Sequence, residues 1–453
     1  MQLRHRKCIP PLVFASTFAL LLLFFTTYYH FHGIPFLSSR HVPVVDDSFH
    51  FVEHQLRPIP VSTLPSPPRF AYLVSGSAGN GNMLRRVLLA IYHPLNQYIV
   101  HLDRKASPQE RLALERFVKG YKVFKEVGNV RMIVKANLIT YRGSTMVANT
   151  LHAAAILLRE GGDWDWFINL SASDYPLVTQ DDLLHTFSHI PRDLNFIDHT
   201  SKIGWKASQR AKPVIIDSGL YNLRRADVFW IRQKRSVPTA FKLFTDNISL
   251  NKFVYVVSIA ESRLKLESSF GLMILHEQTC IRSSAWMVLS RPFIEYCVWG
   301  WDNLPRKVLM YYTNFLSSPE GYFHTVICNA EAFRNTTVNS DLHFISWDNP
   351  PRQHPQLLRL AHMNRMLESN APFARKFYQN GRLLDKIDAE LLSRGREMFT
   401  PGGWCAGSRE NGADPCSVVG TPTVLKPGPG AQRLQALINF LLSDAIFRPR
   451  QCE

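Results

Sequence analysis

From residue 70 onward the sequence alternates between short apolar runs and longer amphipathic runs, and this alternation limits the possible folds more than any other feature. Four runs have the length and composition of strands: FAYLVSGS, QYIVHLD, NVRMIV and DWFINLSASDYP. Two helical runs lie between them, NMLRRVLLAIYH and TMVANTLHAAAILLRE. Ser144 can cap the second helix, and Gly161 and Gly162 can end it. Strands joined through helices pair in parallel, so we expect an α/β fold with a mostly parallel sheet.

Three polar segments follow the expected strands, at residues 75–82, 103–105 and 171–175. In open α/β sheets ligands bind beyond the carboxyl ends of the strands, so these segments are the expected site. The glycine-rich stretch from Gly76 to Gly81 lacks the GxGxxG spacing of a dinucleotide-binding loop. A plain strand-to-helix turn explains that stretch equally well.

An uncharged run, LVFASTFALLLLFFTTYY, occupies residues 12–29 and nearly reaches the ~20 residues that cross a bilayer. A cleaved signal peptide is the alternative, but bulky aromatic residues follow the run where a cleavage site requires small ones. Arg4, Arg6 and Lys7 precede the run, so the positive-inside rule places residues 1–11 in the cytosol. We therefore expect a signal-anchor, a proline-containing stem at residues 30–69 and a lumenal domain at residues 70–453.

The chain carries 52 Lys and Arg residues against 36 Asp and Glu residues, which gives a formal net charge of +16. A basic domain favours polyanionic partners, such as nucleic acid, anionic lipid headgroups or phosphate-bearing small molecules. The expected lumenal topology removes nucleic acid from this set. A nucleic-acid-binding protein would require the predicted anchor to be spurious.

Six of the seven cysteines lie on the expected lumenal side, where disulfides persist: Cys280, Cys297, Cys328, Cys405, Cys416 and Cys452. Their spacing shows no zinc-binding pattern. Cys405 and Cys416 bracket a loop and could bond to one another, or either could bond to Cys452. The sequence leaves the pairing open.

Five segments together resemble glycosyltransferase family 14: FAYLVSGS, YHPLNQYIVHLDRKAS, TYRGSTMVANTLHAAAILL, DWFINLSASDYPL and SPEGYFHTVICN. This family contains the core-2/I-branching N-acetylglucosaminyltransferases and the protein xylosyltransferases. The segments RDLNFIDHTSKIGWK, LHFISWDNPP and SNAPFARKF are most similar to the plant β-glucuronosyltransferases that act on arabinogalactan. The resemblance covers residues 70–377 and implies a GT-A-like fold, a UDP-sugar donor, inversion at the anomeric carbon and a type II Golgi membrane topology.

Inversion needs a base that takes the proton from the acceptor hydroxyl. The resemblance places this base at Glu320, in the segment SSPEGYFHT. The same segment also fits a helix N-terminus, because Ser317, Ser318 and Pro319 form a capping signal and an acid there favours the helix dipole. The two roles are compatible.

The resemblance also implies a set of donor-binding residues: Val74, Asp103, Arg104, Asp174 and Lys376. Val74 is expected to end the first strand, while Asp103 and Arg104 follow the second and contact uracil and ribose. Lys376 matches the lysine that contacts the diphosphate, with Arg375 and Arg352 as weaker candidates. For Asp103, helix capping is the alternative.

The Asp163-Trp-Asp165 segment matches the Asp-x-Asp metal motif of many GT-A enzymes, but it precedes the strand WFINLS instead of following it. The segment that does follow, Ser171 to Asp174, contains a single carboxylate. Because core-2 members of the family work without metal, we expect Lys and Arg side chains to neutralise the leaving diphosphate, with no metal ion.

The relatives pass from a KLFT segment through a single glycine into SAWMVLSRPF, whereas residues 246–283 intervene here. A retained intron or misjudged gene model would explain this segment, and so would an evolved loop. An insertion beside the acceptor site could impair catalysis. Asn247 in this segment and Asn335 in an expected surface loop are candidate N-glycosylation sites, whereas Asn169 lies in a buried strand.

The sequence thus predicts an inverting glycosyltransferase that moves glucuronate from UDP-glucuronate to β-galactan chains of arabinogalactan proteins in the Golgi. A glucuronate donor needs a further cation for its carboxylate, and one segment could supply it through Lys202, Lys206, Arg210 or Lys212. One alternative is a donor such as UDP-N-acetylglucosamine or UDP-xylose. Another is a catalytically impaired homologue that binds glycans.

Overall fold

The computed structural model describes residues 66–200, 210, 212–221, 227–234, 284–349, 354–379, 381–408 and 412–452. These residues belong to the compact unit Pro58–Glu453. Several predictions lie outside the described residues: the tail at 1–11, the anchor at 12–29, most of the stem, the segment 246–283, Lys202, Lys206, Asn247 and Arg352. Within the described part of the chain, no helix has both the length and the apolar character that a membrane span requires.

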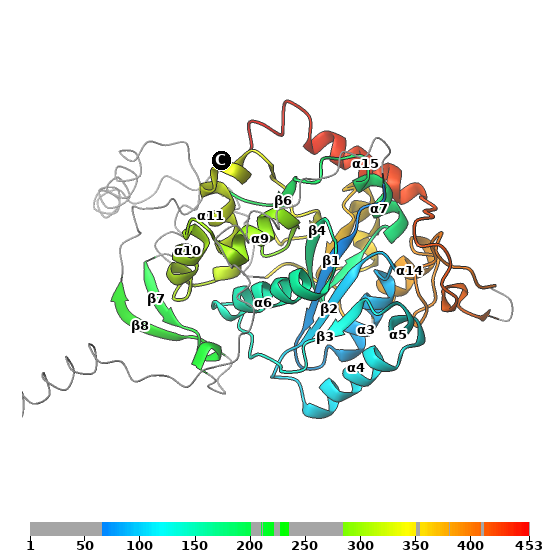
Figure 1. Ribbon diagram of the computed structural model, residues 1–453, viewed down its shortest axis with the longest axis horizontal. Helices are drawn as coiled ribbons and strands as arrows, with labels where there is room; N and C mark the ends of the chain where they lie inside the picture. Colours follow the sequence, from blue (N-terminus) through cyan, green and yellow to red (C-terminus); the bar gives the residue numbers. More distant parts are fainter. Residues whose placement is uncertain are drawn as a thin grey trace, which may run out of the picture. The chain divides into compact units, whose positions relative to one another are not determined.

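A seven-stranded sheet with the order β10-β6-β9-β4-β1-β2-β3 forms the centre of the fold (Figure 1). Its strands are β1 (Phe70–Gly76), β2 (Gln97–Leu102), β3 (Val130–Met132), β4 (Trp166–Ser171), β6 (Asn195–Ile197), β9 (Met287–Ser290) and β10 (Thr337–Val338). Strand β1 pairs in parallel with β2 and β4, whereas β9 runs antiparallel to β4 and β6. The predicted α/β fold with a mostly parallel sheet is confirmed.

Two hydrophobic clusters cover the two faces of this sheet. In β1, Phe70, Tyr72 and Val74 belong to one cluster, and Ala71 and Leu73 belong to the other. This division follows from the two-residue period of a strand, and a strand buried on both faces needs a continuous apolar run. The apolar segment that predicted β1 therefore reflects helices packed on both sides of the sheet.

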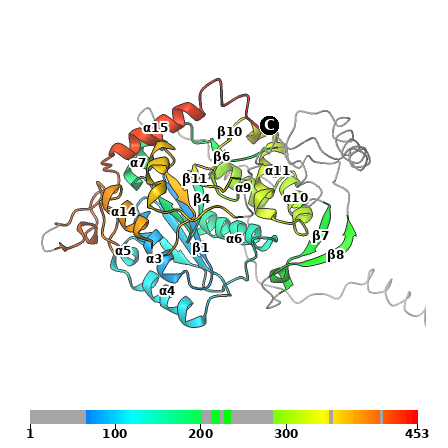
Figure 2. The same ribbon diagram turned by 180° about the vertical axis from the view of Figure 1, so that it is seen from behind.

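We call the two layers the α3 side and the α6 side. The α3 side contains α3 (Gly81–Ala90), α4 (Pro108–Gly120), α5 (Lys122–Val127), α7 (Gln180–Phe187), α14 (Arg382–Glu390) and α15 (Pro429–Leu441). The α6 side contains α6 (Thr145–Glu160), α9 (Arg291–Trp299), α10 (Leu304–Tyr312), α11 (Tyr322–Asn329) and α12 (Glu331–Arg334). The sheet can be followed between these layers from both directions (Figures 1 and 2).

Two smaller sheets accompany the central one. Strand β12 (Phe373–Arg375) pairs in parallel with β11 (His343–Ile345) and antiparallel with β5 (Asp174–Pro176). Strands β7 (Pro213–Ile216) and β8 (Phe229–Lys234) form an antiparallel pair. The remaining elements are α13 (Met363–Glu368) and the 3-10 turns η2 (Ser218–Tyr221), η3 (Ser318–Glu320), η4 (Leu360–His362) and η6 (Pro415–Ser417).

The start of α6 differs from the predicted one. Ser144 takes the N-cap position, but its hydroxyl donates to the backbone oxygen of Thr313, so the predicted side-chain cap is wrong. The carboxylate of Asp217 caps the helix instead and accepts hydrogen bonds from the backbone nitrogen of Thr145 (2.9 Å) and from its hydroxyl (2.7 Å). Gly143 leaves room for this carboxylate, because a Cβ at that position would overlap Asp217.

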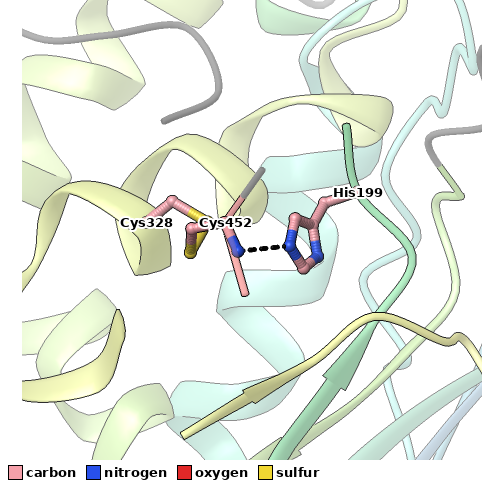
Figure 3. Close-up of side chains that lie close together, drawn as sticks. All are labelled: His199, Cys328 and Cys452. Carbon is pink, nitrogen blue, oxygen red and sulfur yellow. Dashed lines mark hydrogen bonds between the residues drawn. A yellow bond between two sulfur atoms is a disulfide. The ribbon is translucent and has the colours of Figure 1, made fainter. Parts of the chain in front are cut away.

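Among the described cysteines two disulfides form, Cys405–Cys416 and Cys328–Cys452. Cys405 and Cys416 therefore bond to one another, which is one of the pairings that the sequence left open. In the second disulfide, Cys452 lies beside His199, whose Nε2 accepts a hydrogen bond from the backbone nitrogen of Cys452 (2.8 Å; Figure 3). The ligand atoms of His199, Cys328 and Cys452 lie within 4.8 Å of one another, as in a metal site. Because both sulfur atoms are covalently bonded, this group ties the C-terminal segment to α11.

Candidate active site

The loops that follow β1, β2 and β4 meet at the carboxyl edge of the sheet. The backbone nitrogen of Asp103 donates to the carbonyl of Gly76 (3.0 Å), and the hydroxyl of Ser77 donates to the Asp103 carboxylate (2.9 Å). On the other flank, the backbone nitrogen of Ala172 donates to the carbonyl of Ser75 (2.8 Å). The three segments that the sequence singled out therefore lie side by side, and we call this region the donor edge.

Asp103 is buried at the donor edge. Its carboxylate also accepts a hydrogen bond from the backbone nitrogen of Lys105 (2.9 Å), and burial raises the pKa of Asp103 above its usual value. The helix-capping alternative is wrong, because Ser107 caps α4 through the backbone nitrogen of Glu110. Arg104 follows with an exposed side chain, and its backbone nitrogen donates to the carbonyl of Asn137 (3.0 Å).

Val74 does not end β1, because Ser75 and Gly76 continue the pairing with β2. The Val74 side chain is fully buried in the cluster on the α3 side. The boundary that the sequence predicted was therefore two residues too early. A contribution of Val74 to donor binding stays a prediction.

Asp174 begins strand β5 instead of lying in a loop, and its side chain is fully buried. Its Oδ2 accepts hydrogen bonds from the backbone nitrogen of Ser171 and from the indole nitrogen of Trp286, both at 2.5 Å. Its Oδ1 lies 3.4 Å from Nε of Arg375, which strand β12 places directly opposite. The single carboxylate that follows β4 is therefore engaged by an arginine and two N–H groups.

Lys376 comes directly after β12. The backbone nitrogen of Leu358 donates to its carbonyl, and the next residue, Phe377, donates its backbone nitrogen to the carbonyl of Ser173, both at 2.9 Å. Lys376 is half-buried beside the loop that joins β4 to β5. These contacts place the backbone of Lys376 next to the donor edge, and the diphosphate contact of its side chain stays a prediction.

Glu320 ends the turn η3, and Gly321 separates it from α11. Its Oε1 accepts a hydrogen bond from the hydroxyl of Tyr141 (2.8 Å), and its Oε2 accepts one from Nη1 of Arg210 (2.5 Å). The predicted side-chain capping by the Ser317-Ser318-Pro319 signal is wrong, because the N-cap residue of η3, Ser317, makes no side-chain capping hydrogen bond. The hydroxyl of Ser318 donates to the backbone carbonyls of Tyr312 and Phe315. The Glu320 carboxylate is thus held in a fixed orientation by two side chains.

Tyr141 connects Glu320 to the donor edge. Its ring stacks on Trp286 with 6.3 Å between centroids, and Trp286 donates to Asp174. Although Tyr141 is 41% exposed, its hydroxyl is desolvated, and this burial together with the negative charge of Glu320 raises the pKa of Tyr141 well above its usual value. The phenol therefore remains a hydrogen-bond donor at neutral pH.

Three residues of this arrangement were not assigned to it from the sequence. Tyr141 lies in the TYRG segment that carried the family resemblance, and Trp286 lies three residues after the segment 246–283. Arg210 belongs to the basic segment proposed for the donor carboxylate, but its structural partner is Glu320. The guanidinium of Arg375, the weaker diphosphate candidate, lies 3.2 Å from the centre of the Trp286 ring.

The sequence of residues 70–367 matches the core-2/I-branching enzyme family. The chain belongs to this family. It is 62% identical to Beta-glucuronosyltransferase GlcAT14A of Arabidopsis thaliana over 98% of this chain and 92% of the relative, and 60% identical to Beta-glucuronosyltransferase GlcAT14B over 99% and 95%. Xylosyltransferase 1 of Canis lupus familiaris is 27% identical over 63% of this chain and 25% of the relative. These comparisons confirm the predicted glycosyltransferase of family 14, which uses a nucleotide-sugar donor and a glycan acceptor.

Within this core-2/I-branching enzyme, the Asp163-Trp-Asp165 segment lies at the amino end of β4. The Asp165 carboxylate accepts hydrogen bonds from the backbone nitrogen of Arg69 (2.8 Å) and from Nη1 of Arg192 (2.7 Å). Asp163 lies 3.9 Å from Arg291. Both carboxylates are thus at the end of the strand opposite to the donor edge, which supports the interpretation that this segment is not the metal motif.

The candidate glycosylation sites differ in exposure. Asn169 is buried, and its amide nitrogen donates to the carbonyl of Ala285 (2.7 Å), as expected for a residue inside a strand. Asn335 is exposed at the end of α12. The enzyme therefore presents Asn335 at its surface, and glycosylation there stays a prediction.

Proposed function

We propose that the chain transfers glucuronate, with inversion, from UDP-glucuronate to β-linked galactan chains of arabinogalactan proteins. Two relatives named as β-glucuronosyltransferases match it over nearly their whole length at 60% identity or more. The structural observation that carries the proposal is the orientation of Glu320 by Tyr141 and Arg210. Contacts through Trp286 join this carboxylate to the donor edge.

In the proposed reaction Glu320 takes the proton from the acceptor hydroxyl. The hydroxyl oxygen forms a bond to the anomeric carbon while the bond from that carbon to the UDP oxygen breaks, and UDP leaves with the electron pair. The attacking oxygen must lie about 3 Å from the carboxylate and about 3–3.5 Å from the anomeric carbon. Inversion follows because the base and the leaving group act on opposite faces of the sugar.

The departing diphosphate carries concentrated negative charge that the site has to neutralise. In this proposal Lys376 and Arg375 supply the positive charge without a metal ion. Lys376 is placed beside the loop between β4 and β5, and Arg375 is fixed by Asp174 and Trp286. Transfer should therefore persist in EDTA, and loss of transfer in EDTA with recovery in Mn²⁺ would contradict this part of the proposal.

We also propose that the enzyme is a single-pass type II protein of the Golgi membrane with the folded domain in the lumen. The uncharged run at residues 12–29 and the cations before it support this topology. The two disulfides support an oxidising compartment. Two results are expected: protection of the domain from protease in intact vesicles, and a mass decrease on glycosidase treatment that is smaller in Asn335→Gln.

The decisive experiment offers the purified enzyme a panel of UDP-sugars with galactan oligosaccharides. A second form has residues 246–283 replaced by one glycine. We expect transfer from UDP-glucuronate, with the shortened form at least as active as the full chain. Transfer from UDP-xylose or UDP-N-acetylglucosamine alone would replace the proposed donor, and binding without any transfer in both forms would indicate a glycan-binding homologue.

A further inference from the structure

The contact between Arg210 and Glu320 restricts the proposed base. Oε2 of Glu320 lies 2.5 Å from Nη1 of Arg210, and their side chains are only 14% and 26% exposed. Tyr141 holds the other carboxylate oxygen. A charge-assisted hydrogen bond that is partly removed from water is strong. An acceptor hydroxyl therefore competes with Arg210 for Oε2 of Glu320, whereas Tyr141 orients the carboxylate through Oε1.

We propose that Arg210 recognises the carboxylate of the sugar donor, and that its movement from Glu320 to this carboxylate releases the base. This inference rests on the proposed function, because it requires a uronic acid donor. It gives Arg210 a role in donor selection, in addition to its contact with Glu320.

The reaction geometry brings the two carboxylates into the same space. An acceptor hydroxyl about 3 Å from Glu320 and about 3–3.5 Å from the anomeric carbon places that carbon roughly 6 Å from the base. The carboxyl group of glucuronate is attached to C5, which is joined to the anomeric carbon through the ring oxygen. The proposal places the guanidinium of Arg210, which is at hydrogen-bonding distance from Glu320, beside the donor carboxylate.

Arginine chemistry suits this exchange. A guanidinium presents five N–H donors in a planar fork that binds a carboxylate through two parallel hydrogen bonds. A carboxylate that loses a neighbouring cation accepts a proton more readily. Moving the guanidinium to the donor thus binds the sugar and activates the base in one step.

Two other arginines near the site have acidic partners of their own. Arg375 is held by Asp174 and by the ring of Trp286. Arg142 lies 3.1 Å from Asp227. Arg210 differs from both because its acidic partner is the proposed base itself. A donor carboxylate can therefore draw Arg210 away only by freeing Glu320.

A neutral donor provides the contrast. UDP-xylose has the ring of UDP-glucuronate without the C5 carboxyl group, so it offers Arg210 no new partner. The guanidinium would remain on Glu320, and the base would stay occupied. Discrimination between the two donors should then appear in kcat as well as in KM.

The test compares Arg210→Ala with Tyr141→Phe, since each variant removes one of the two side chains that hold Glu320. Transfer rates are measured with UDP-glucuronate and UDP-xylose, and UDP-xylose is also measured as a competitive inhibitor where its transfer is too slow. For Arg210→Ala, kcat/KM with UDP-glucuronate should fall about 100-fold and the preference over UDP-xylose by at least tenfold, because a bidentate charged contact is lost. For Tyr141→Phe, both donors should lose the same factor. Arg210→Lys should retain part of the preference.

An equal loss for both donors in Arg210→Ala would show that Arg210 only positions Glu320, and would overturn the inference. Melting temperatures of the variants provide the folding control, and Arg210→Gln replaces Arg210→Ala if the latter does not fold. Failure of the unmodified enzyme to use UDP-glucuronate is a separate outcome. It would refute the proposed function, and this inference with it.

Discussion

Backbone pairing holds Asp174 at the donor edge, whereas side chains from distant segments hold Glu320. Strands β5 and β12 place Arg375 opposite Asp174 through their register. Glu320 lies in a three-residue 3-10 turn, and its partners Tyr141 and Arg210 are 179 and 110 residues away in the sequence. The donor edge is thus fixed by the sheet, and the base region depends on individual side-chain contacts that a single substitution can remove.

The largest expected effect tests the base region. Glu320→Gln keeps the shape of the side chain but removes the proton acceptor, so kcat should fall by about 10²–10⁴. UDP binding, measured by calorimetry, should stay unchanged because the donor edge is intact. Glu331→Gln, at an exposed glutamate in α12, is the matched control. A rate near that of the unmodified enzyme would exclude Glu320 as the base.

The next effect tests the donor edge. Asp174→Ala leaves Arg375 and the indole nitrogen of Trp286 without their buried partner. The free energy of unfolding should fall by about 3 kcal/mol, and UDP binding should weaken as well. Asp165→Ala, at the opposite end of β4, should reduce stability without changing UDP affinity. Unchanged UDP binding in Asp174→Ala would remove this residue from the donor site.

The base region and the donor edge each contain a buried neutral histidine, and the two can be compared by lowering the pH. Burial, followed by repulsion from His199, lowers the pKa of His324 in α11 to about 3, and burial, followed by repulsion from His152, lowers the pKa of His101 in β2 to about 4. An unfolded histidine has a pKa near 6.5. Below that pH the unfolded chain therefore binds a proton that the native state does not.

The free energy of unfolding should have its full value above pH 6.5. As the pH falls below 6.5, it should decrease by about 1.4 kcal/mol per pH unit for each such histidine, until the pH reaches the pKa of that histidine in the folded state. Urea titrations between pH 7.5 and 5 measure this slope. His324→Gln and His101→Gln should each reduce this slope by about 1.4 kcal/mol per pH unit. An unchanged slope in both buried variants would contradict the neutral state of these histidines.

The smallest expected effect concerns Tyr141. Tyr141→Phe removes one hydrogen bond to Glu320 but keeps the ring stacked on Trp286, so kcat should fall about tenfold while stability changes little. Tyr141→Ala removes the stacking as well and should also weaken donor binding. Identical kinetics for the two variants would show that the stacking does not couple the base region to the donor edge.

The difference between backbone pairing at the donor edge and side-chain contacts around Glu320 explains what the sequence could predict. Asp103 and Asp174 follow apolar runs with strand periodicity, and parallel strands bring their carboxyl ends to one edge. Glu320 was found through a resemblance that covers a whole segment. The error at Val74 arose because Ser75 and Gly76 are not apolar and yet continue the pairing of β1.

Contacts between distant side chains could not be predicted in this way. The cap of α6 is Asp217 and not Ser144, because a carboxylate from another segment occupies the space that Gly143 leaves open. Likewise, nothing near Arg210 in the sequence indicates that its partner is Glu320. Such pairings depend on how elements pack, and a local pattern of residue types does not encode them.

The two disulfides have a consequence for the order in which the enzyme matures. Cys405 and Cys416 are 11 residues apart, and Cys328 and Cys452 are 124 apart. A short loop closes at a lower entropic cost, so the Cys405–Cys416 bond should form first and remove two wrong partners for Cys328. Of these two bonds, the long bridge, which anchors the helix next to the proposed base, should form second. The helix that follows the proposed base would therefore be tied to the C-terminal segment only after the Cys405–Cys416 loop has closed.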